Sequence, residues 1–272
     1  METPKPQLHQ SALTTLSNCG VQYYRRYILG EKIPPAVAMV VGSATHKSIE
    51  MNLAAVIRGD AMLPVEQVKD VARDELEGLW KSGISLSDEE LKEGMKAVKG
   101  AAIDTAIALS ALHRTDLAPS LMPTAVERKF VLKLDGFPMD LAGQIDIQEG
   151  AARIRDTKTA AKSPSQTEAD DSLQLTMYGL AAKVIDGIPP AEFALDALVK
   201  TKEPKLKTLK TTRTNSDFEM LLRRVERAVK VIESGAFQPA KPTDWICSRR
   251  FCGFWNSCEF ASRPTSVFVE KE

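Results

Sequence analysis

The stretch I-R-D-T-K-T-A, Ile154 to Ala160, indicates a short strand that carries a carboxylate and an ammonium group two residues apart. Residues i and i+2 of a strand face the same side of a sheet, so we expect Asp156 and Lys158 to point into one space and Thr157 to point away. Such a triplet, taken alone, is most often an ion pair on the surface of a sheet. Its interpretation therefore depends on the residues around it.

A β-hairpin is predicted immediately before this strand. The segment A-V-E-R-K-F-V-L-K-L alternates in polarity, Asp135-Gly136 is a tight-turn signal, and F-P-M-D-L-A-G-Q-I-D-I-Q returns. The returning strand carries Asp146, and pairing with the next strand would bring Asp146 close to Asp156. Two carboxylates are costly to hold together unless a cation lies between them, and a hard divalent ion such as Mg²⁺ prefers carboxylate oxygens.

This combination suits the hydrolysis of a phosphodiester bond. A bound metal ion can acidify a water molecule into a nucleophile, and a second ion can stabilise the leaving oxygen. Lys158 can hold that nucleophile or neutralise charge that develops on a phosphate. His46 can add a nitrogen ligand for a softer ion such as Mn²⁺, although a lone histidine is usually a surface or core residue. Gln174 and Tyr178 lie four residues apart, on one face of the helix predicted after the strand.

Helices are predicted before the hairpin, and strands and helices alternate after it. Ser43 is a candidate N-cap for a helix that ends at Gly59, and Ser87 to Glu90 form a capping box for a helix over 87–113. The other elements expected are a short helix or turn within 11–29, helices over 65–82, 169–186 and 215–234, and strands over 151–160 and 192–200. This order predicts an α/β core with a helical N-terminal elaboration.

The composition is that of a globular protein that can bury a core. The chain has 272 residues, of which 43% are hydrophobic, and its 36 basic and 36 acidic side chains give no net charge. This excludes a globally basic nucleic-acid binder but allows a locally basic groove. No signal peptide or membrane-spanning run is present, so we expect a soluble cytoplasmic protein. Thiols stay reduced there, and the four cysteines are therefore expected to be metal ligands and not disulfides.

Four short motifs occur in a fixed order along the chain: G-x-x-x-H, G-x-x-D, D-x-K and Q-x-x-x-Y. That order resembles the PD-(D/E)xK nuclease superfamily, specifically its RecB-like branch, which includes the nuclease domains of bacterial AddB and RecB and the CRISPR adaptation exonucleases. The matching residues are Gly42 and His46, Gly143 and Asp146, Asp156 and Lys158, and Gln174 and Tyr178.

The resemblance implies both a fold and a site. The implied fold is a restriction-endonuclease-like central mixed sheet flanked by helices. We expect it as one domain over 1–272, with a mostly helical part (1–122), a catalytic α/β core (123–236) and a cysteine-bearing tail (237–272). The implied ligands of Mg²⁺ or Mn²⁺ are His46, Asp146, Asp156 and the Thr157 carbonyl. Lys158 would be the catalytic lysine, and Gln174 and Tyr178 would position the lysine or the DNA strand.

The four cysteines carry a second resemblance. Cys247, Cys252 and Cys258 lie in C-S-R-R-F-C-G-F-W-N-S-C, and Cys19 stands more than two hundred residues earlier. Close C-x₂-C pairs typical of zinc sites are missing, whereas a [4Fe–4S] cluster takes four thiolates at freer spacing. The arrangement resembles the structural iron–sulfur staple of AddB-type and CRISPR-associated nucleases, which ties the two ends of the chain together. Its C-x₄-C spacing is longer than the C-x₂-C usual there, so zinc remains the alternative occupant.

Other residues have less specific interpretations. Lys200 to Arg213 carries six basic residues and one acid, and is predicted to be a strand end and an exposed loop or hairpin. It is either a solvated segment or a lip that contacts DNA phosphates. Tyr23 to Arg26 suits stacking with single-stranded DNA or packing against the core. Glu127 suits either an outer carboxylate of the metal site or a solvent-facing strand charge, and we expect the latter. The aromatic residues expected to shield the cluster are Trp245, Phe251, Phe254 and Trp255.

These observations predict a metal-dependent deoxyribonuclease, most simply an exonuclease on single-stranded DNA or DNA ends, with a structural [4Fe–4S] cluster. The alternatives are a structure-specific endonuclease and a non-catalytic DNA-binding subunit of a repair or adaptation complex. Uncompensated carboxylates argue against a non-catalytic role, because they are costly to keep together. No helicase motif is present, so any motor in recombination or CRISPR adaptation would be a partner protein.

Overall fold

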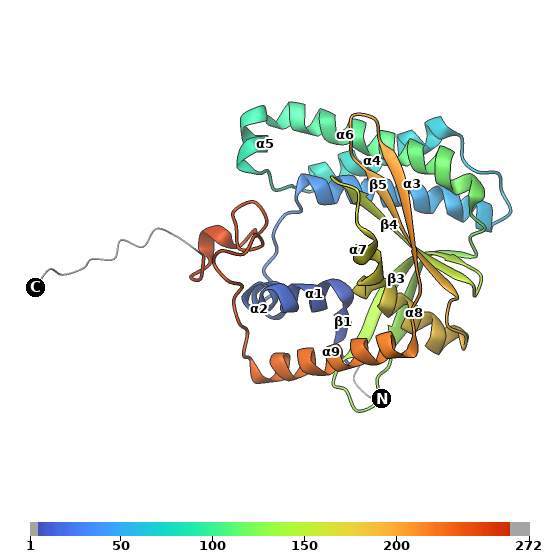
Figure 1. Ribbon diagram of the computed structural model, residues 1–272. Helices are drawn as coiled ribbons and strands as arrows, with labels where there is room; N and C mark the ends of the chain where they lie inside the picture. The colour runs from blue at the N-terminus through green and yellow to red at the C-terminus, as the bar shows by residue number, and fades with distance from the viewer. Residues whose placement is uncertain (1–4, 262–272) are drawn as a thin grey trace, which may run out of the picture.

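A mixed sheet lies between two layers of helices in the computed structural model, which describes residues 5–261 (Figure 1). Within that range the sheet has six strands, in the order β1-β3-β4-β5-β6, with β2 also paired to β3. The strands are β1 (Gln7–His9), β2 (Ala125–Leu132), β3 (Asp140–Glu149), β4 (Arg153–Ala160), β5 (Glu192–Val199) and β6 (Lys205–Thr211). The pairs β1–β3 and β4–β5 are parallel and the others antiparallel. The expected mixed sheet is therefore confirmed.

Strand β3 has three neighbours because two of them share one of its edges. β2 pairs along most of the strand, from Leu132 opposite Leu141 to Ala125 opposite Gln148. On the other edge, β1 pairs only with residues 140–142 and β4 only with residues 147–149. The intervening residues, 143–146, therefore lie beside a gap between β1 and β4.

The two helical layers contain separate hydrophobic cores. One face of the sheet is covered by α3 (Val37–Ile57), α4 (Val65–Lys81) and α6 (Met95–Leu112), which pack over Ile147 and Leu198 (Figure 1). The other face is covered by α1 (Gln10–Asn18), α8 (Leu173–Asp186) and α9 (Asn215–Ser234), which pack over Phe130 and Phe193. Helix α4 shows why the layers form, since it buries Val68, Ala72 and Leu76 at four-residue spacing and leaves a polar face outside.

Short elements complete the described part of the chain. They are α2 (Gly20–Tyr23), α5 (Asp88–Glu93), α7 (Gln166–Asp170), the π-helical turns η1 (Tyr24–Ile28) and η2 (His113–Leu117), and the 3₁₀ turns η3 (Ala118–Ser120) and η4 (Trp255–Ser257). Within residues 5–261, no helix combines the length and the apolar character needed to cross a membrane.

The helix expected to begin at Ser43 begins six residues earlier, at Val37. Val37, Val40 and Val41 are buried in the core beneath the helix, so burial extends it back to the end of the Pro34-Pro35 segment. His46 therefore lies in the middle of α3, where the backbone is held by turns on both sides.

Two other expected helices are each divided in two. Gly94, with a φ of +88°, separates α5 from α6 and breaks the helix expected over 87–113. The predicted capping box is confirmed, because Ser87 Oγ accepts the Glu90 N–H and the Glu90 carboxylate accepts the Ser87 N–H. The helix expected over 169–186 is divided into α7 and α8, and Ser172 caps the start of α8.

The predicted hairpin forms, but its connection is longer than a tight turn. β2 ends at Leu132 and β3 begins at Asp140, with Gly136 at a φ of +77° between them. Pro138 lies within the connection and has no N–H to donate, so strand pairing begins only beyond it. This changes the register of the hairpin from the one that a two-residue turn would give.

Candidate active site

Asp146 and Asp156 face each other at the point where β3 and β4 separate. Ile147 and Arg155 are the last residues paired between these strands, and the two aspartates follow one step further in the same register. Asp146 Oδ2 accepts the Thr157 N–H at 3.0 Å, so the carboxylate replaces the partner that β3 no longer provides. The aspartates are only 7% and 0% exposed. The expected convergence of two carboxylates is therefore present in the structure.

The buried pair carries more negative charge than its surroundings neutralise. Burial raises the pKa of Asp146, and burial together with repulsion from Asp146 raises the pKa of Asp156 to about 7. Neither oxygen of Asp156 accepts a hydrogen bond from any residue in the described part of the chain. Lys158 Nζ lies 3.1 Å from Asp156 Oδ1 and is its nearby positive charge. A buried carboxylate in this state is costly, and a bound cation would lower the cost.

A chain of hydrogen bonds leads from Lys158 back to Asp146. Lys158 Nζ donates to Gln174 Oε1 at 2.7 Å, and Gln174 Nε2 donates to the Tyr178 hydroxyl at 2.5 Å. That hydroxyl donates to Asp146 Oδ1 at 3.4 Å. Gln174 and Tyr178 are one turn apart on α8, so the helix presents both side chains to the ends of β3 and β4. The lysine therefore has a fixed orientation beside the carboxylates.

Tyr178 remains a hydrogen-bond donor throughout the physiological pH range. Burial, followed by the charges of Asp146 and Asp156, raises the pKa of its hydroxyl. A phenol that acts as a base would instead need a lowered pKa. The residue is therefore suited to orienting Asp146 and Gln174 and not to taking up a proton.

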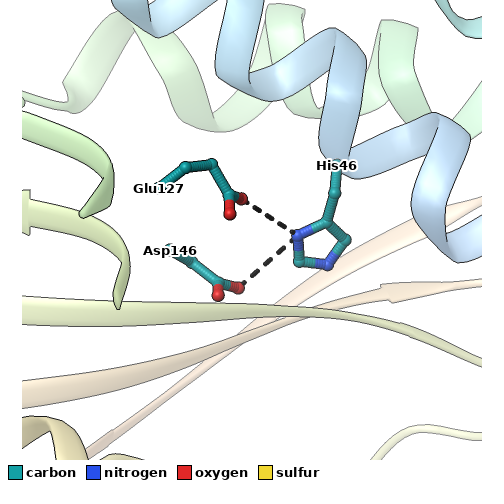
Figure 2. Close-up of side chains that lie close together, drawn as sticks. All are labelled: His46, Glu127 and Asp146. Atoms are coloured by element: carbon teal, nitrogen blue, oxygen red, sulfur yellow. Dashed lines mark ion pairs between the residues drawn. The ribbon is translucent and has the colours of Figure 1, made fainter. Parts of the chain in front are cut away.

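His46 reaches Asp146 from the other helical layer (Figure 2). Its Nδ1 lies 3.6 Å from Asp146 Oδ2 and 3.7 Å from Glu127 Oε1. Burial opposes the charged form of His46, but the carboxylates of Glu127, Asp146 and Asp156 outweigh burial and raise the pKa of the imidazole. The donor atoms of His46, Glu127 and Asp146 lie within 4.8 Å of one another, so this group could bind a metal ion. An imidazole with two carboxylates suits Mn²⁺ and related divalent ions.

Glu127 belongs to this group, and the expectation that it faces solvent was wrong. Its φ of +50° is unusual for a residue other than glycine, and the β2–β3 ladder omits it. Gln144 Nε2 donates a short hydrogen bond to Glu127 Oε2. The local backbone therefore turns the side chain out of the strand alternation and toward His46, which an alternating sequence pattern does not reveal.

The glycines of the two motifs have different surroundings. A Cβ on Gly143 would lie 2.6 Å from the Phe130 ring, which packs edge-on against Tyr178 with 6.2 Å between centroids. Gly143 therefore makes room for the ring that supports the tyrosine. A Cβ on Gly42 would lie 3.4 Å from Thr159 Oγ1, an ordinary contact distance. Gly42 marks a close approach of α3 to β4 but leaves room for a methyl group.

The four cysteines line one pocket between α2 and the C-terminal tail. The pocket is lined by Cys19, Cys247, Cys252 and Cys258, among other residues. Cys19 Sγ accepts the backbone N–H groups of Gln22 and Ala240, at 3.4 and 3.3 Å. Burial and the three other cysteines raise the pKa of the Cys252 thiol. Among the residues that the structure describes, no three of the sulfur atoms lie within 4.8 Å of one another.

Aromatic and arginine side chains beside this pocket pack mainly against the protein. Tyr23 is buried and stacks on Phe237, with 5.8 Å between ring centroids. Arg25 pairs with Glu31 at 2.6 Å and lies over the Phe254 ring at 4.4 Å. Of the two interpretations of this segment, the contacts favour packing. The tail rings are not uniformly covered, since Phe254 is buried while Trp245 and Phe251 are exposed and pack edge to face against each other.

The basic segment from Lys200 to Arg213 includes strand β6 and contributes largely to the fold. Lys207 donates to the Pro164 carbonyl, and Lys210 pairs with Glu192. Arg213 donates to the Ala169 and Ser172 carbonyls and so ties β6 to the ends of α7 and α8. Burial lowers the pKa of Arg213 and of Lys200. These contacts favour the structural interpretation of the segment over a lip for DNA.

Two buried carboxylates, a lysine and a histidine therefore lie close together at one edge of the mixed sheet. The family model of the PD-(D/E)XK nuclease superfamily matches residues 7–259, and the chain belongs to this superfamily, whose nucleases are hydrolases that use divalent metals. No curated protein matches the chain.

The chain was also compared with solved structures, and one of them shows a similar fold. A crystal structure from Eubacterium rectale, of a protein provisionally named an exonuclease, is 13% identical in sequence with a TM-score of 0.57, and the match covers 96% of this chain and 91% of that one. The crystal structure of SSO0001 is also 13% identical, with a TM-score of 0.39 and coverage of 97% and 90%. At such low identity the first match supports the fold alone, and the second carries no argument.

Proposed function

We propose that the protein is a deoxyribonuclease of the RecB-like type that hydrolyses phosphodiester bonds as an exonuclease on single-stranded DNA or DNA ends. The observation that carries this proposal is the arrangement of Lys158 between Asp156 and the Gln174–Tyr178 pair. These contacts hold an ammonium group beside two buried carboxylates that have too little positive charge around them. A site of this kind fits a divalent ion and a phosphate, and a structural ion pair would not need the second carboxylate.

The residues of the site would have different roles in hydrolysis. Asp146, Asp156, His46 and the Thr157 carbonyl would hold Mg²⁺ or Mn²⁺, and the ion would supply an acidified water molecule. Lys158 would stabilise the negative charge that develops on the phosphate oxygens, because it is held on the carboxylate side of the site. Gln174 and Tyr178 would keep Lys158 and Asp146 in their orientations.

We also propose that the cysteine pocket holds a structural [4Fe–4S] cluster. Four thiols from the two ends of the described chain line one pocket, and backbone N–H groups already point at Cys19 Sγ. Four thiolates on one zinc ion, at about 2.3 Å from the metal, would lie about 3.8 Å apart. The sulfur atoms here are more widely spread than that, with no three within 4.8 Å among the described residues, which favours the larger cluster over zinc.

Degradation of end-labelled DNA tests the catalytic proposal. Anaerobically purified protein is incubated with labelled single-stranded and double-stranded DNA in Mg²⁺, in Mn²⁺ and in EDTA. We expect shortening from a DNA end that depends on the metal and is lost in Lys158→Ala, while Lys96→Ala, an exposed lysine on α6, keeps the activity. Internal cuts would identify the protein as an endonuclease and not an exonuclease. Intact DNA under every metal condition would contradict the proposal.

Iron and zinc content tests the cluster independently of activity. Wild-type protein purified without oxygen is expected to contain iron and sulfide and to show the visible absorbance of an iron–sulfur cluster. Cys252→Ser should lose both. Stoichiometric zinc without iron would identify the alternative occupant.

A further inference from the structure

Two loops lie side by side at the edge of the sheet where the parallel strands β4 and β5 end. They are residues 161–165, after β4, and residues 200–204, between β5 and β6. Lys200 N donates to the Ala160 carbonyl at 2.8 Å, and Lys207 Nζ donates to the Pro164 carbonyl at 2.8 Å. These bonds hold the two loops together along one edge. Sheets with parallel strands commonly bind their ligands at the carboxyl ends of those strands.

This edge is basic and lacks the acids that would neutralise it. Within the described part of the chain, four lysines in or next to the two loops have no ion pair or side-chain hydrogen bond, namely Lys162, Lys200, Lys202 and Lys205. The two loops contain a single acidic residue, Glu203. We call these four lysines the basic edge. Its charge is available to a ligand because no described residue takes it up.

Lys200 is the member of the basic edge that is most costly to keep. Its side chain is half-buried, and burial lowers the pKa of its ammonium group without a described carboxylate to oppose this effect. Taking a charge out of water costs free energy unless a partner of opposite charge is close. A bound anion beside Lys200 would offset that cost. The fold itself gains nothing from the unpaired charge.

The structural contacts of the basic segment come from its later residues. Lys210 pairs with Glu192, and Arg213 donates to backbone carbonyl groups of the protein. Lys200, Lys202 and Lys205 precede them and make no such side-chain contacts in the described structure. The segment therefore has a structural part on β6 and an unpartnered part at the loop.

The basic edge begins close to the proposed catalytic lysine. Lys162 follows Lys158 by four residues, so their Cα atoms are at most about 14 Å apart. A stacked DNA strand carries one phosphate for about every 3.4 Å of its axis, so a strand whose scissile phosphate lies at Lys158 would place further phosphates along this length. A row of unpaired lysines matches a row of phosphates.

We propose that Lys162 and Lys200 bind backbone phosphates of the DNA strand on one side of the cleavage point. Lys202 and Lys205 would add a weaker attraction, since both are exposed. This inference rests on the proposed function and deepens it, because it assigns the path of the substrate strand across the ends of β4 and β5. The contacts are purely electrostatic and involve no metal ion, so they should persist in EDTA.

Salt-dependent DNA binding in EDTA tests the inference apart from catalysis. The affinity for a labelled single-stranded oligonucleotide is measured by fluorescence anisotropy over a range of NaCl concentrations. In the double variant Lys162→Gln/Lys200→Gln we expect binding to weaken about tenfold at low salt. The slope of log affinity against log salt should fall by about 1.4, because each phosphate contact contributes about 0.7 on a single strand. Lys230→Gln, at an exposed lysine on α9 in one of the helical layers, should stay close to wild type in both.

Stability measurements separate phosphate binding from a structural role. Lys200→Gln should keep or raise the urea midpoint of unfolding, because it removes a half-buried charge that has no described partner. Lys200→Arg keeps the charge and should retain the salt slope. A lower midpoint with unchanged DNA binding would overturn the inference. If Lys200→Gln does not fold, Lys162→Gln on its exposed loop tests the same edge and should alone reduce the slope by about 0.7.

Other results also overturn the inference. An unchanged salt slope in the double variant would do so, as would an equal loss of affinity in Lys230→Gln. Cleavage of DNA by the wild-type protein in Mg²⁺ and in Mn²⁺ is assayed in parallel. Cleavage together with an unchanged slope in the double variant contradicts this inference and keeps the proposed function. Absence of cleavage by the wild-type protein with either metal contradicts the function itself.

Discussion

Tyr178 connects the two halves of the site through one hydroxyl group, which both accepts from Gln174 and donates to Asp146. We expect Tyr178→Phe to lower kcat on DNA by about tenfold, the equivalent of one lost hydrogen bond of about 1.4 kcal/mol. KM should change little, because the hydroxyl does not extend to the outer surface. Steady-state kinetics at saturating Mn²⁺ measure both parameters, and Tyr27→Phe, at an exposed tyrosine, is the control. An unchanged kcat would show that Gln174 and Asp146 are oriented without the phenol.

His113 is a buried base that costs stability in acid. It begins η2, is 1% exposed, and its Nε2 has no hydrogen-bond partner within residues 5–261. Burial, helped by the positive charges of His46 and Arg155, lowers its pKa from 6.5 to about 3. Protonation therefore favours the unfolded chain, and stability that is complete above pH 6.5 is lost progressively as the pH falls toward 3. Between pH 7 and pH 5 the loss should be about 2 kcal/mol.

Urea unfolding at pH 7 and pH 5 checks this expectation. His113→Phe retains a ring of similar size but cannot be protonated. The variant should therefore lose less stability in acid than the wild-type protein. The difference in free energy of unfolding between the two proteins should change by about 2 kcal/mol between pH 7 and pH 5. Carboxylates titrate equally in both proteins and cancel in the comparison. An equal loss in both proteins would mean that His113 is not the source.

At this scale the sequence contained most of the site. The spacing of D-x-K, of Q-x-x-x-Y and of the returning hairpin strand brought Asp146, Asp156, Lys158 and Tyr178 into mutual contact. Those contacts follow from the periodicity of strands and helices, because the spacing of D-x-K places two residues on one face of a strand and that of Q-x-x-x-Y places two on one face of a helix. Glu127 could not be predicted in this way, because its position depends on one φ angle.

At the scale of elements, the two motif glycines should respond in opposite ways to alanine. Gly143→Ala forces a methyl group into the Phe130 ring and should reduce the free energy of unfolding by about 1–3 kcal/mol. It should also lower activity, because the displaced ring supports Tyr178. Gly42→Ala adds a methyl group within a helix that has room for it, and should be neutral or stabilise by up to about 1 kcal/mol.

Chemical denaturation of both variants, together with their DNA-cleavage rates, makes this comparison. Each protein serves as the control for the other, because both changes are the same substitution in a catalytic motif. Equal losses in the free energy of unfolding of the two variants would show that the close contact between Gly143 and the Phe130 ring is not the cause of the destabilisation.

The register of the β2–β3 hairpin also differs from the one that the tight-turn signal predicts. A two-residue turn at Asp135-Gly136 would set Glu127 opposite Gln144. The observed register, with Leu132 opposite Leu141, sets it opposite Asp146 instead. Pro138 lies in the connection between the two strands and has no N–H to donate to the ladder. The sequence was sufficient for the existence and order of these strands but not for their alignment, because a tight-turn signal is local and the register depends on the whole connection.

At the scale of the whole molecule, Gly20 joins the N-terminal helices to the segment that carries the C-terminal cysteines. Gly20 N donates to the Gln238 carbonyl at 2.7 Å, and a Cβ on Gly20 would lie 2.7 Å from the Gln238 backbone nitrogen. Gly20→Ala should therefore push this segment away, move Ala240 from Cys19, and lower the free energy of unfolding by about 1–3 kcal/mol. It should also lower the iron content that the proposed cluster would give.

Thermal unfolding and iron analysis of anaerobically purified protein test this expectation. Gly78→Ala is the control, because a Cβ there meets nothing within 4 Å on an exposed helix face. Unchanged stability in Gly20→Ala would mean that the two segments separate without cost. Lower stability with unchanged iron content would show that the contact at Gly20 stabilises the fold but is not needed for binding of the proposed cluster.

The overall class of the fold was predictable because the alternation of strands and helices after residue 123 is regular. The pairing of β1 with β3 was not, since β1 has only three residues and no alternation to detect. A strand this short is stabilised by its neighbours and carries little signal of its own. The same limit applies to any segment whose structure depends on residues far away in the chain.

That distant pairing gives the protein an order of assembly during synthesis. Helices α3, α4 and α6 contact one another through nearby sequence, so this layer can form while the ribosome is still making the sheet. β1 has no partner until residues 140–142 emerge, and Cys19 meets its pocket only after Cys258. Strand β1 and Cys19 are therefore among the last parts of the described chain to find their partners. A nascent chain would keep this segment and its thiol open to chaperones until translation is almost complete.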